Sequence, residues 1–253
     1  MMKTFENADQ RFMQQQSEDL SAAFRWFARL NWHEAHANHF SVAVNDSGSA
    51  FLINPGGRHF ANVRAGELLL LDSDEPPAGD LSKTLDPTAW HIHSAIHRSN
   101  PHARCAMHLH SPGVLALSCL EDKNLPPIDN NTARFFKRIA VDESFDGMGL
   151  SGEEGDRLAE CIGDRSVLLM GNHGVLVVGE SVAQTFDDLY YFERACQTYI
   201  SALSTGRKLS VLSDDIAEKT ARQWEDYSGF AESHLREIRE ILDREEPDYK
   251  SWE

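Results

Sequence analysis

Short strand-like segments alternate with helical segments along the chain, and this alternation limits the fold more than any other feature. Asp46-Ser47-Gly48 is a hairpin signal between apolar segments. Strands are predicted at residues 40–44, 50–55, 67–72, 104–110, 166–170 and 175–179. Helices are predicted at residues 17–31, 86–98, 112–120, 152–162 and 182–204. Hairpins mixed with helices favour an α/β fold with a central, mostly antiparallel sheet and helices on both faces.

Charge and apolar content exclude several classes of partner. The chain has 253 residues, with 40 Asp and Glu against 24 Lys and Arg, so its formal charge is −16. An acidic chain lacks the basic face that nucleic acids or anionic membranes require. No apolar run approaches the roughly 20 residues of a membrane span. No signal-peptide core is present, so a cytoplasmic location is predicted, and four scattered cysteines without a CxxC pair predict free thiols.

Histidine is unusually concentrated in one part of the sequence. The chain has 12 histidines, and ten of them lie between His33 and His110. His108 and His110 alternate with Leu109 in a predicted strand, so both imidazoles point to the same side, about 6–7 Å apart along the strand. Such a pair can share a metal ion, although two ordinary histidines explain the pattern equally well.

A second histidine signal lies between two apolar strands. In Asn172-His173-Gly174 a tight turn holds the imidazole in one direction, which suits a third metal ligand, while an ordinary turn histidine is the alternative. His93 and His97 share a helix face, with His91 turned away, and this favours structural hydrogen bonds.

The segment from His33 to His39 is dense in polar groups just before a predicted strand. His39 or Glu34 can contact a substrate there, and a solvated loop is the alternative.

Taken together, the patterns resemble the class II aldolase/adducin family from about residue 17 to 205. The resemblance rests on WHIHSAIHRSNPHA, CAMHLHSP and LLMGNHGVLVVG, followed by a long helix. It implies a single domain with a three-layer α/β/α sandwich, a helical extension at about 214–243, and assembly as a homotetramer with sites between protomers. It also implies one divalent metal on His108, His110 and His173, with zinc as the usual ion and manganese or iron(II) as alternatives.

The sequence departs from the sugar-phosphate aldolases of this family at several positions. Their acid/base glutamate, four residues before His93, is Ala89 here. Their three phosphate-contacting segments are altered at Asn38-His39, Gly56-Gly57 and Pro87-Thr88, which argues against a phosphorylated substrate. Their proton-donating tyrosine has no counterpart between residues 130 and 151. The resemblance still assigns substrate contacts to Asn38, Ser41, Asn54, Gly57 and Thr88.

These observations lead to three functional hypotheses. Three neutral imidazoles and a divalent ion carry a charge of about +2, which favours a small anionic chelator. The first hypothesis is a metal-dependent carbon–carbon lyase, an aldolase or decarboxylase, acting on a small non-phosphorylated carbonyl or hydroxy acid, with the metal as Lewis acid for an enolate. The acid/base is then His39 at the substrate-facing family position, Glu34, a metal-bound water or a neighbouring subunit. The alternatives are a non-haem iron oxygenase of aryl-pyruvate-type acids and a non-catalytic adducin-like binding module.

Overall fold

One mixed sheet forms the centre of the protein. Among the residues that this computed structural model describes (7–77, 84–144 and 151–252), seven strands pair in the order β3-β2-β1-β4-β7-β6-β5. The strands are β1 (His39–Ala43), β2 (Ala50–Ile53), β3 (Leu69–Asp72), β4 (Cys105–Leu109), β5 (Ile139–Asp142), β6 (Val167–Met170) and β7 (Gly174–Gly179). Neighbouring strands are antiparallel except β5 and β6, which are parallel. The mostly antiparallel sheet predicted from the sequence is confirmed, and β5 is a strand that the sequence patterns did not predict.

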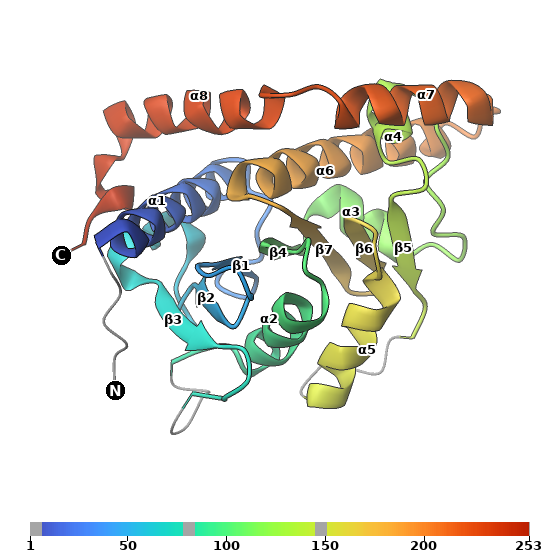
Figure 1. The fold of residues 1–253 in the computed structure, drawn as a ribbon. Coiled ribbons are helices and arrows are strands. Elements are labelled where there is room, and N and C mark those ends of the chain that lie inside the picture. Colours follow the sequence, from blue (N-terminus) through green and yellow to red (C-terminus); the bar gives the residue numbers. More distant parts are fainter. Residues whose placement is uncertain (1–6, 78–83, 145–150, 253) are drawn as a thin grey trace.

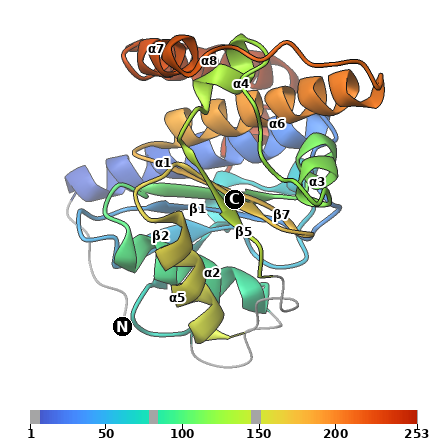
Figure 2. The same cartoon turned by 90° about the vertical axis from the view of Figure 1, so that its right-hand side faces the viewer.

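Helices cover both faces of this sheet. They are α1 (Asn7–Arg29), α2 (Pro87–Ser99), α3 (Pro112–Ser118), α4 (Asn130–Arg134), α5 (Gly152–Ile162), α6 (Val182–Ser204), α7 (Asp214–Glu225) and α8 (Phe230–Glu245). Figures 1 and 2 show α2 and α5 on one face and α1 and α6 on the other. Apolar residues of α1 and α6 share one buried core, and those of α2 and α5 share another. The predicted three-layer α/β/α sandwich is therefore confirmed.

The alternation of side chains along β4 determines which layer each residue faces. Cys105, Met107 and Leu109 belong to the core beneath α1 and α6, whereas Ala106 belongs to the core beneath α2 and α5. Because successive residues of a strand point to opposite faces, His108 lies on the α2 side of the sheet. The strand thus directs one histidine away from the larger core.

The C-terminal segment forms two helices that lie outside α1 and α6 (Figure 1). The chain turns between them at Gly229, whose φ of 77° lies in the left-handed region that glycine adopts without strain. Leu235 and Ile238 of α8 are buried against the core that α1 and α6 share. The helical pattern over residues 214–243 is therefore interrupted once, and its apolar side packs on the same chain.

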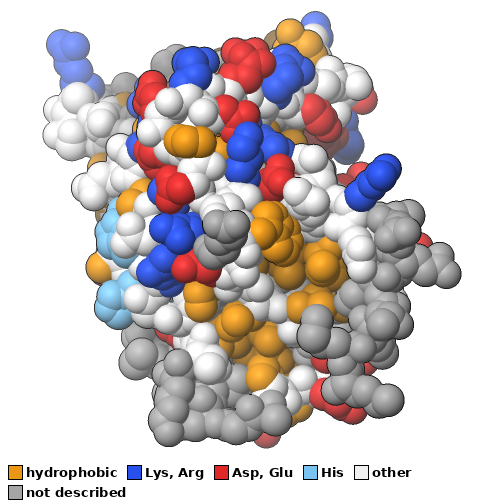
Figure 3. Space-filling model, turned by 90° about the vertical axis from the view of Figure 1, so that its left-hand side faces the viewer, with side chains coloured by type: hydrophobic (Ala, Val, Ile, Leu, Met, Phe, Trp, Pro, Cys, Tyr) orange, Lys and Arg blue, Asp and Glu red, His pale blue; other side chains and the backbone are white. Residues whose placement is uncertain are grey.

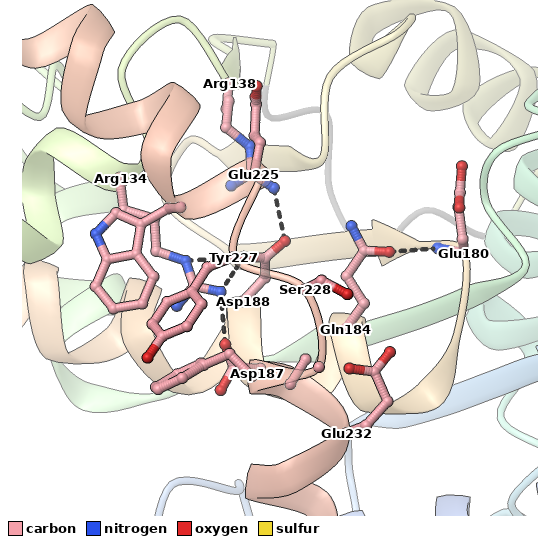
Figure 4. Close-up of a pocket in the computed structure, with 14 residues that line it drawn as sticks. Arg134, Arg138, Glu180, Gln184, Asp187, Asp188, Glu225, Tyr227, Ser228 and Glu232 are labelled. Carbon is pink, nitrogen blue, oxygen red and sulfur yellow. Dashed lines mark hydrogen bonds and ion pairs between the residues drawn. The ribbon is translucent and has the colours of Figure 1, made fainter.

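Buried ion pairs join α4 to α6 beside a cavity of about 300 Å³ (Figure 4). Arg134 donates to Asp187 at 2.6 Å and to Asp188 at 2.8 Å. Its guanidinium also lies 4.8 Å from the ring of Tyr191 and 4.9 Å from that of Trp224. Cation–π contacts and paired charges together hold the outer helical layer in place.

The sheet edge at β3 carries exposed apolar surface. Figure 3 views the molecule from the side on which β3 lies in Figure 1, and hydrophobic side chains gather near the middle of this face. Leu70 of β3 is 42% exposed.

In the described part of the chain, no helix is long and apolar enough to cross a lipid bilayer.

Candidate metal centre

His108, His110 and His173 meet where β4 ends and β7 begins. β4 and β7 are paired antiparallel, with Leu109 opposite Val175, so the turn that precedes β7 lies beside the end of β4. One ring nitrogen from each histidine falls within a group whose members lie within 4.8 Å of one another. A Cβ at Gly174 would lie 2.6 Å from the Leu109 carbonyl oxygen, so the turn requires glycine there. The structure brings together all three residues of the predicted ligand set.

Hydrogen bonds orient two of the three rings. His108 Nδ1 donates to the Val175 carbonyl oxygen at 2.9 Å, and His110 Nδ1 contacts the Glu34 carboxylate. Because these partners are acceptors, the Nε2 atom of each neutral ring carries a lone pair rather than a proton. The two Nε2 atoms lie 2.9 Å apart. Two converging lone pairs repel each other unless a cation lies between them, so the donor set fits a divalent metal ion.

Burial keeps the imidazoles of His108 and His173 neutral. Burial, with repulsion from His110, lowers the pKa of His108 well below its usual value. Burial likewise lowers the pKa of His173 to about 4. Because a histidine ligates metal only through an unprotonated nitrogen, both groups are ready to bind at neutral pH.

His39 lies beside the three-histidine cluster. Its ring is stacked on that of His108, with 4.8 Å between centroids. Both rings line a cavity of about 360 Å³, together with Asp86 and Thr88. Burial lowers the pKa of His39 to about 4, although the Asp86 carboxylate opposes the shift. An uncharged imidazole next to the cluster is placed to accept a proton.

The charge of the cavity differs from the expectation of about +2. Glu34 and Asp86 both line it, and neither carboxylate was counted in that expectation. Among the described residues that line the cavity, none is Lys or Arg. A divalent ion here would be offset by two carboxylates, so metal ligation rather than long-range attraction must select an anionic ligand.

The predicted substrate contacts fall into two groups. Asn38 and Thr88 line the cavity. Asn54 lies outside its lining: the side chain accepts from the Phe40 amide at 3.1 Å and donates to the Asn38 carbonyl at 3.3 Å. Ser41 is buried between two histidines, and Gly57 lies in a turn with open space around it. The structure therefore brings only Asn38 and Thr88 of this set to the cavity with His39.

Helix α2 contributes groups whose roles the sequence indicated only in part. His93 and His97 are buried and both contact the Ser41 hydroxyl, which confirms the structural hydrogen bonds predicted for this helix face. Ala89 is fully buried in an apolar cluster, so packing fills the position of the missing glutamate. Asp86 caps the start of α2 by accepting from the Thr88 amide, and the sequence did not predict that it lines the cavity. Its place at the start of α2, beside Thr88, was the signal for a cavity residue.

A buried carboxylate positions the chain after His110. Glu193 of α6 accepts from the Ser111 hydroxyl at 2.6 Å and from the amides of Gly113 and Val114 at 2.8 and 2.9 Å. These bonds satisfy the start of α3, whose other end accepts the Asn172 amide at the Ser118 carbonyl, 3.0 Å away. Helix α3 thus links the segment that follows His110 to the turn that carries His173.

Comparisons with known proteins agree with this arrangement. A family model described as "Class II Aldolase and Adducin N-terminal domain" matches residues 18–200. A putative aldolase class 2 protein from Caulobacter vibrioides is 30% identical over 205 residues, covering 81% of this chain and 79% of the relative. The crystal structure of an aldolase II superfamily protein from Pseudomonas syringae superimposes with a TM-score of 0.86 at 29% identity, covering 95% of this chain and 96% of that protein.

Two further relatives come from Streptomyces and are each 26% identical over 223 residues, which cover 85% of this chain. One is Decarboxylase NovR from Streptomyces niveus, covered over 82% of its length. The other is 4-hydroxy-3-prenylphenylpyruvate oxygenase/4-hydroxy-3-prenylbenzoate synthase from Streptomyces roseochromogenus, covered over 80%. The family match spans the central sheet, the helices that cover it and the three clustered histidines, and the chain therefore belongs to the class II aldolase and adducin family.

Proposed function

We propose that this protein is a divalent-metal-dependent lyase that acts on a small, non-phosphorylated carbonyl or hydroxy acid by aldol cleavage or decarboxylation. The observation that carries the proposal is the 2.9 Å approach of the Nε2 atoms of His108 and His110, whose Nδ1 atoms each face an oxygen acceptor. The imidazole of His173 lies in the same group of ring nitrogens and also supports the proposal.

Zinc is the ion that suits this donor set best, because three imidazoles leave a fourth tetrahedral position for substrate. Manganese and iron(II) are the alternatives. A divalent ion held there would stabilise negative charge that develops on a substrate oxygen. Glu34 orients His110 by contact with its Nδ1, which is the usual role of a carboxylate behind a metal-ligating histidine.

His39 is the proposed acid/base. Because the Glu34 carboxylate contacts His110, we favour His39 over Glu34 as the residue that exchanges a proton with a substrate in the cavity. Its ring lines the cavity and stacks on His108, so a proton can pass between substrate and Nε2. The Asp86 carboxylate favours the charged ring after the proton is taken up. Water bound to the metal and a neighbouring subunit are the other sources of a proton.

The substrate class follows from the cavity. Its volume of about 360 Å³ suits a small molecule, and no described lining residue is a lysine or arginine that could pair with a phosphate. Thr88 donates its hydroxyl proton to Asp86 at 2.6 Å, so it is not available as a phosphate donor. These observations support a carboxylate that chelates the ion through a neighbouring carbonyl or hydroxyl oxygen.

The test begins with metal content. Untagged protein should contain about one zinc, manganese or iron ion per chain, and His108→Ala and His173→Ala should each abolish it. His36→Ala removes an exposed histidine and serves as the matched control. The loaded protein is then incubated with a panel of 2-keto and 2-hydroxy acids, and release of aldehyde, pyruvate or carbon dioxide is measured. Metal-loaded protein that releases none of these from any acid would refute the lyase.

An iron-dependent oxygenase is the second candidate, because one relative is named for oxygenation of a prenylated hydroxyphenylpyruvate. Oxygen uptake with iron(II) and an aryl-pyruvate, absent with zinc, would favour it over the lyase. Absence of bound metal even after reconstitution would instead favour a non-catalytic module of the adducin type. Assembly as a homotetramer remains a prediction from the resemblance, and the mass of the protein in solution tests it.

A further inference from the structure

A chain of buried hydrogen bonds runs from the backbone to His39. It begins at the carbonyl oxygen of Ala103 and passes through His97, Ser41 and His93, from helix α2 to strand β1 and back. All three of these side chains are buried: Ser41 and His93 are 0% exposed and His97 is 3% exposed. Nothing in the proposed chemistry uses these groups directly, yet their order has a consequence for His39.

The bond to the Ala103 carbonyl oxygen determines which atom donates in every other hydrogen bond of this series. A carbonyl oxygen can only accept, so His97 Nδ1 donates to Ala103, 2.8 Å away. Burial lowers the pKa of His97 to about 4, which keeps its ring neutral at pH 7. A neutral ring that donates from Nδ1 must accept at Nε2, and the atom facing it, 2.7 Å away, is the Ser41 hydroxyl. Ser41 therefore donates its single proton to His97.

The same logic carries through the next two contacts. Because Ser41 donates its only proton to His97, Ser41 Oγ can only accept from its other neighbour. That neighbour is His93 Nδ1, which is therefore the donor. His93 is also kept neutral by burial, so its Nε2 is an acceptor. That atom lies 2.7 Å from His39 Nδ1, which must be the donor. His39 consequently holds its proton at Nδ1.

The other nitrogen of His39 lies on the cavity side. Thr88 Oγ1 is 3.5 Å from His39 Nε2, and its proton already goes to Asp86 at 2.6 Å. A lone pair at Nε2 therefore meets no competing donor from Thr88. We propose that Ser41, His93 and His97 are positioning residues that fix His39 as the Nδ1-protonated tautomer, with an unprotonated Nε2 facing the cavity. This inference rests on the proposed role of His39 as acid/base, but its test does not require turnover.

The test is long-range proton–nitrogen correlation spectroscopy on zinc-loaded protein labelled with nitrogen-15 in its histidines. The spectrum separates protonated from unprotonated ring nitrogens, and the His39→Gln spectrum identifies the His39 signals. In the wild type, His39 is expected to show a protonated Nδ1 and an unprotonated Nε2. A protonated Nε2 in the wild type overturns the proposal by itself.

Ser41→Ala tests the connection through the chain. Loss of the hydroxyl separates His93 from Ala103, so the ratio of the Nδ1-protonated to the Nε2-protonated form of His39 should fall by about tenfold, the size of one buried hydrogen bond. Ser94→Ala removes a buried hydroxyl of α2 that takes no part in these hydrogen bonds, so it should leave the tautomer ratio of His39 unchanged. An unchanged ratio in Ser41→Ala would overturn the proposal. His93→Leu supplies the same test if Ser41→Ala does not fold.

The outcomes separate this inference from the proposed lyase. If no acid is turned over but the tautomer shifts in Ser41→Ala, the positioning chain holds and the proposed function fails. If turnover is found, Ser41→Ala should lower kcat with little change in KM, because substrate binding at the metal does not involve the hydroxyl. Equal kcat in Ser41→Ala and Ser94→Ala would count against the positioning role.

Discussion

Acid should destabilise the metal-free protein between pH 7 and pH 4, and the share of His97 can be worked out from its surroundings. The ring is 3% exposed and its pKa is lowered from 6.5 to about 4, mainly by burial. The unfolded chain therefore binds a proton at His97 over this range while the folded chain does not. The contribution of His97 to the free energy of unfolding is present in full above pH 6.5, and it is lost as the pH falls toward 4.

The magnitude follows from linkage. With an unfolded pKa of 6.5 and a folded pKa of about 4, the free energy of unfolding falls by about 2 kcal/mol between pH 7 and pH 5, and by about 3 kcal/mol at pH 4. No discount for solvent screening applies, because the imidazole is buried. Other buried histidines add to the total, so the wild-type loss over this range should exceed the share of His97.

The assay is urea unfolding of chelator-treated protein at pH 7, 6 and 5, at one protein concentration. His97→Gln removes the titrating ring, so its stability should fall by about 2 kcal/mol less than the wild type between pH 7 and pH 5. His36→Gln, which removes an exposed ring, should follow the wild-type curve. If His97→Gln and the wild type lose the same stability over this range, the reasoning from burial is refuted.

Three further substitutions test other contacts. Glu34→Ala removes the carboxylate behind His110 and should weaken metal affinity about 10- to 100-fold in a chelator competition; unchanged affinity contradicts the orienting role. Glu193→Ala leaves buried donors at the start of α3 without an acceptor and should lower the free energy of unfolding by about 2–4 kcal/mol in urea; a loss below about 0.5 kcal/mol would contradict it. Arg134→Met removes a guanidinium that bonds both Asp187 and Asp188, while Arg138 and His234 still contact these carboxylates, so it should cost about 1.5–3 kcal/mol in the same assay. A loss below about 0.5 kcal/mol would show that Arg134 does not hold the two aspartates.

Local sequence signals predicted most of the elements. Helix α6 runs over Val182–Ser204, the range expected from apolar spacing and the serine before it. Helix α1 begins ten residues earlier than the predicted residue 17, because the polar turns before it lack the apolar face that periodicity detects. Residues 139–142 form a four-residue strand, and no glycine or proline within two residues of either end marks it off as a separate segment. Its parallel pairing with β6 is set by tertiary packing rather than by a turn.

The sequence likewise predicted one part of the candidate site and not another. His108, His110 and His173 were identified because a strand and a tight turn restrict where each ring points. The link from His97 to His39 could not be predicted, because Ser41 lies more than fifty residues from both α2 histidines in the sequence. Only the packing of α2 against β1 brings that hydroxyl between them. Helical spacing predicted the shared face of two histidines but not their partner on the other element.

The pairing of β4 with β7 has a further consequence, for the order in which the protein can assemble. His108 and the carbonyl oxygen that orients it are 67 residues apart in the chain, and His173 lies on the far side of the same gap. No short fragment can hold the three rings together, so strong metal binding has to await closure of a long loop between the two central strands. A metal ion at the proposed site would therefore not nucleate folding. It would stabilise only chains in which β4 and β7 are already paired. Metal retention should accordingly persist while α7 and α8 fray and disappear when β4 and β7 part.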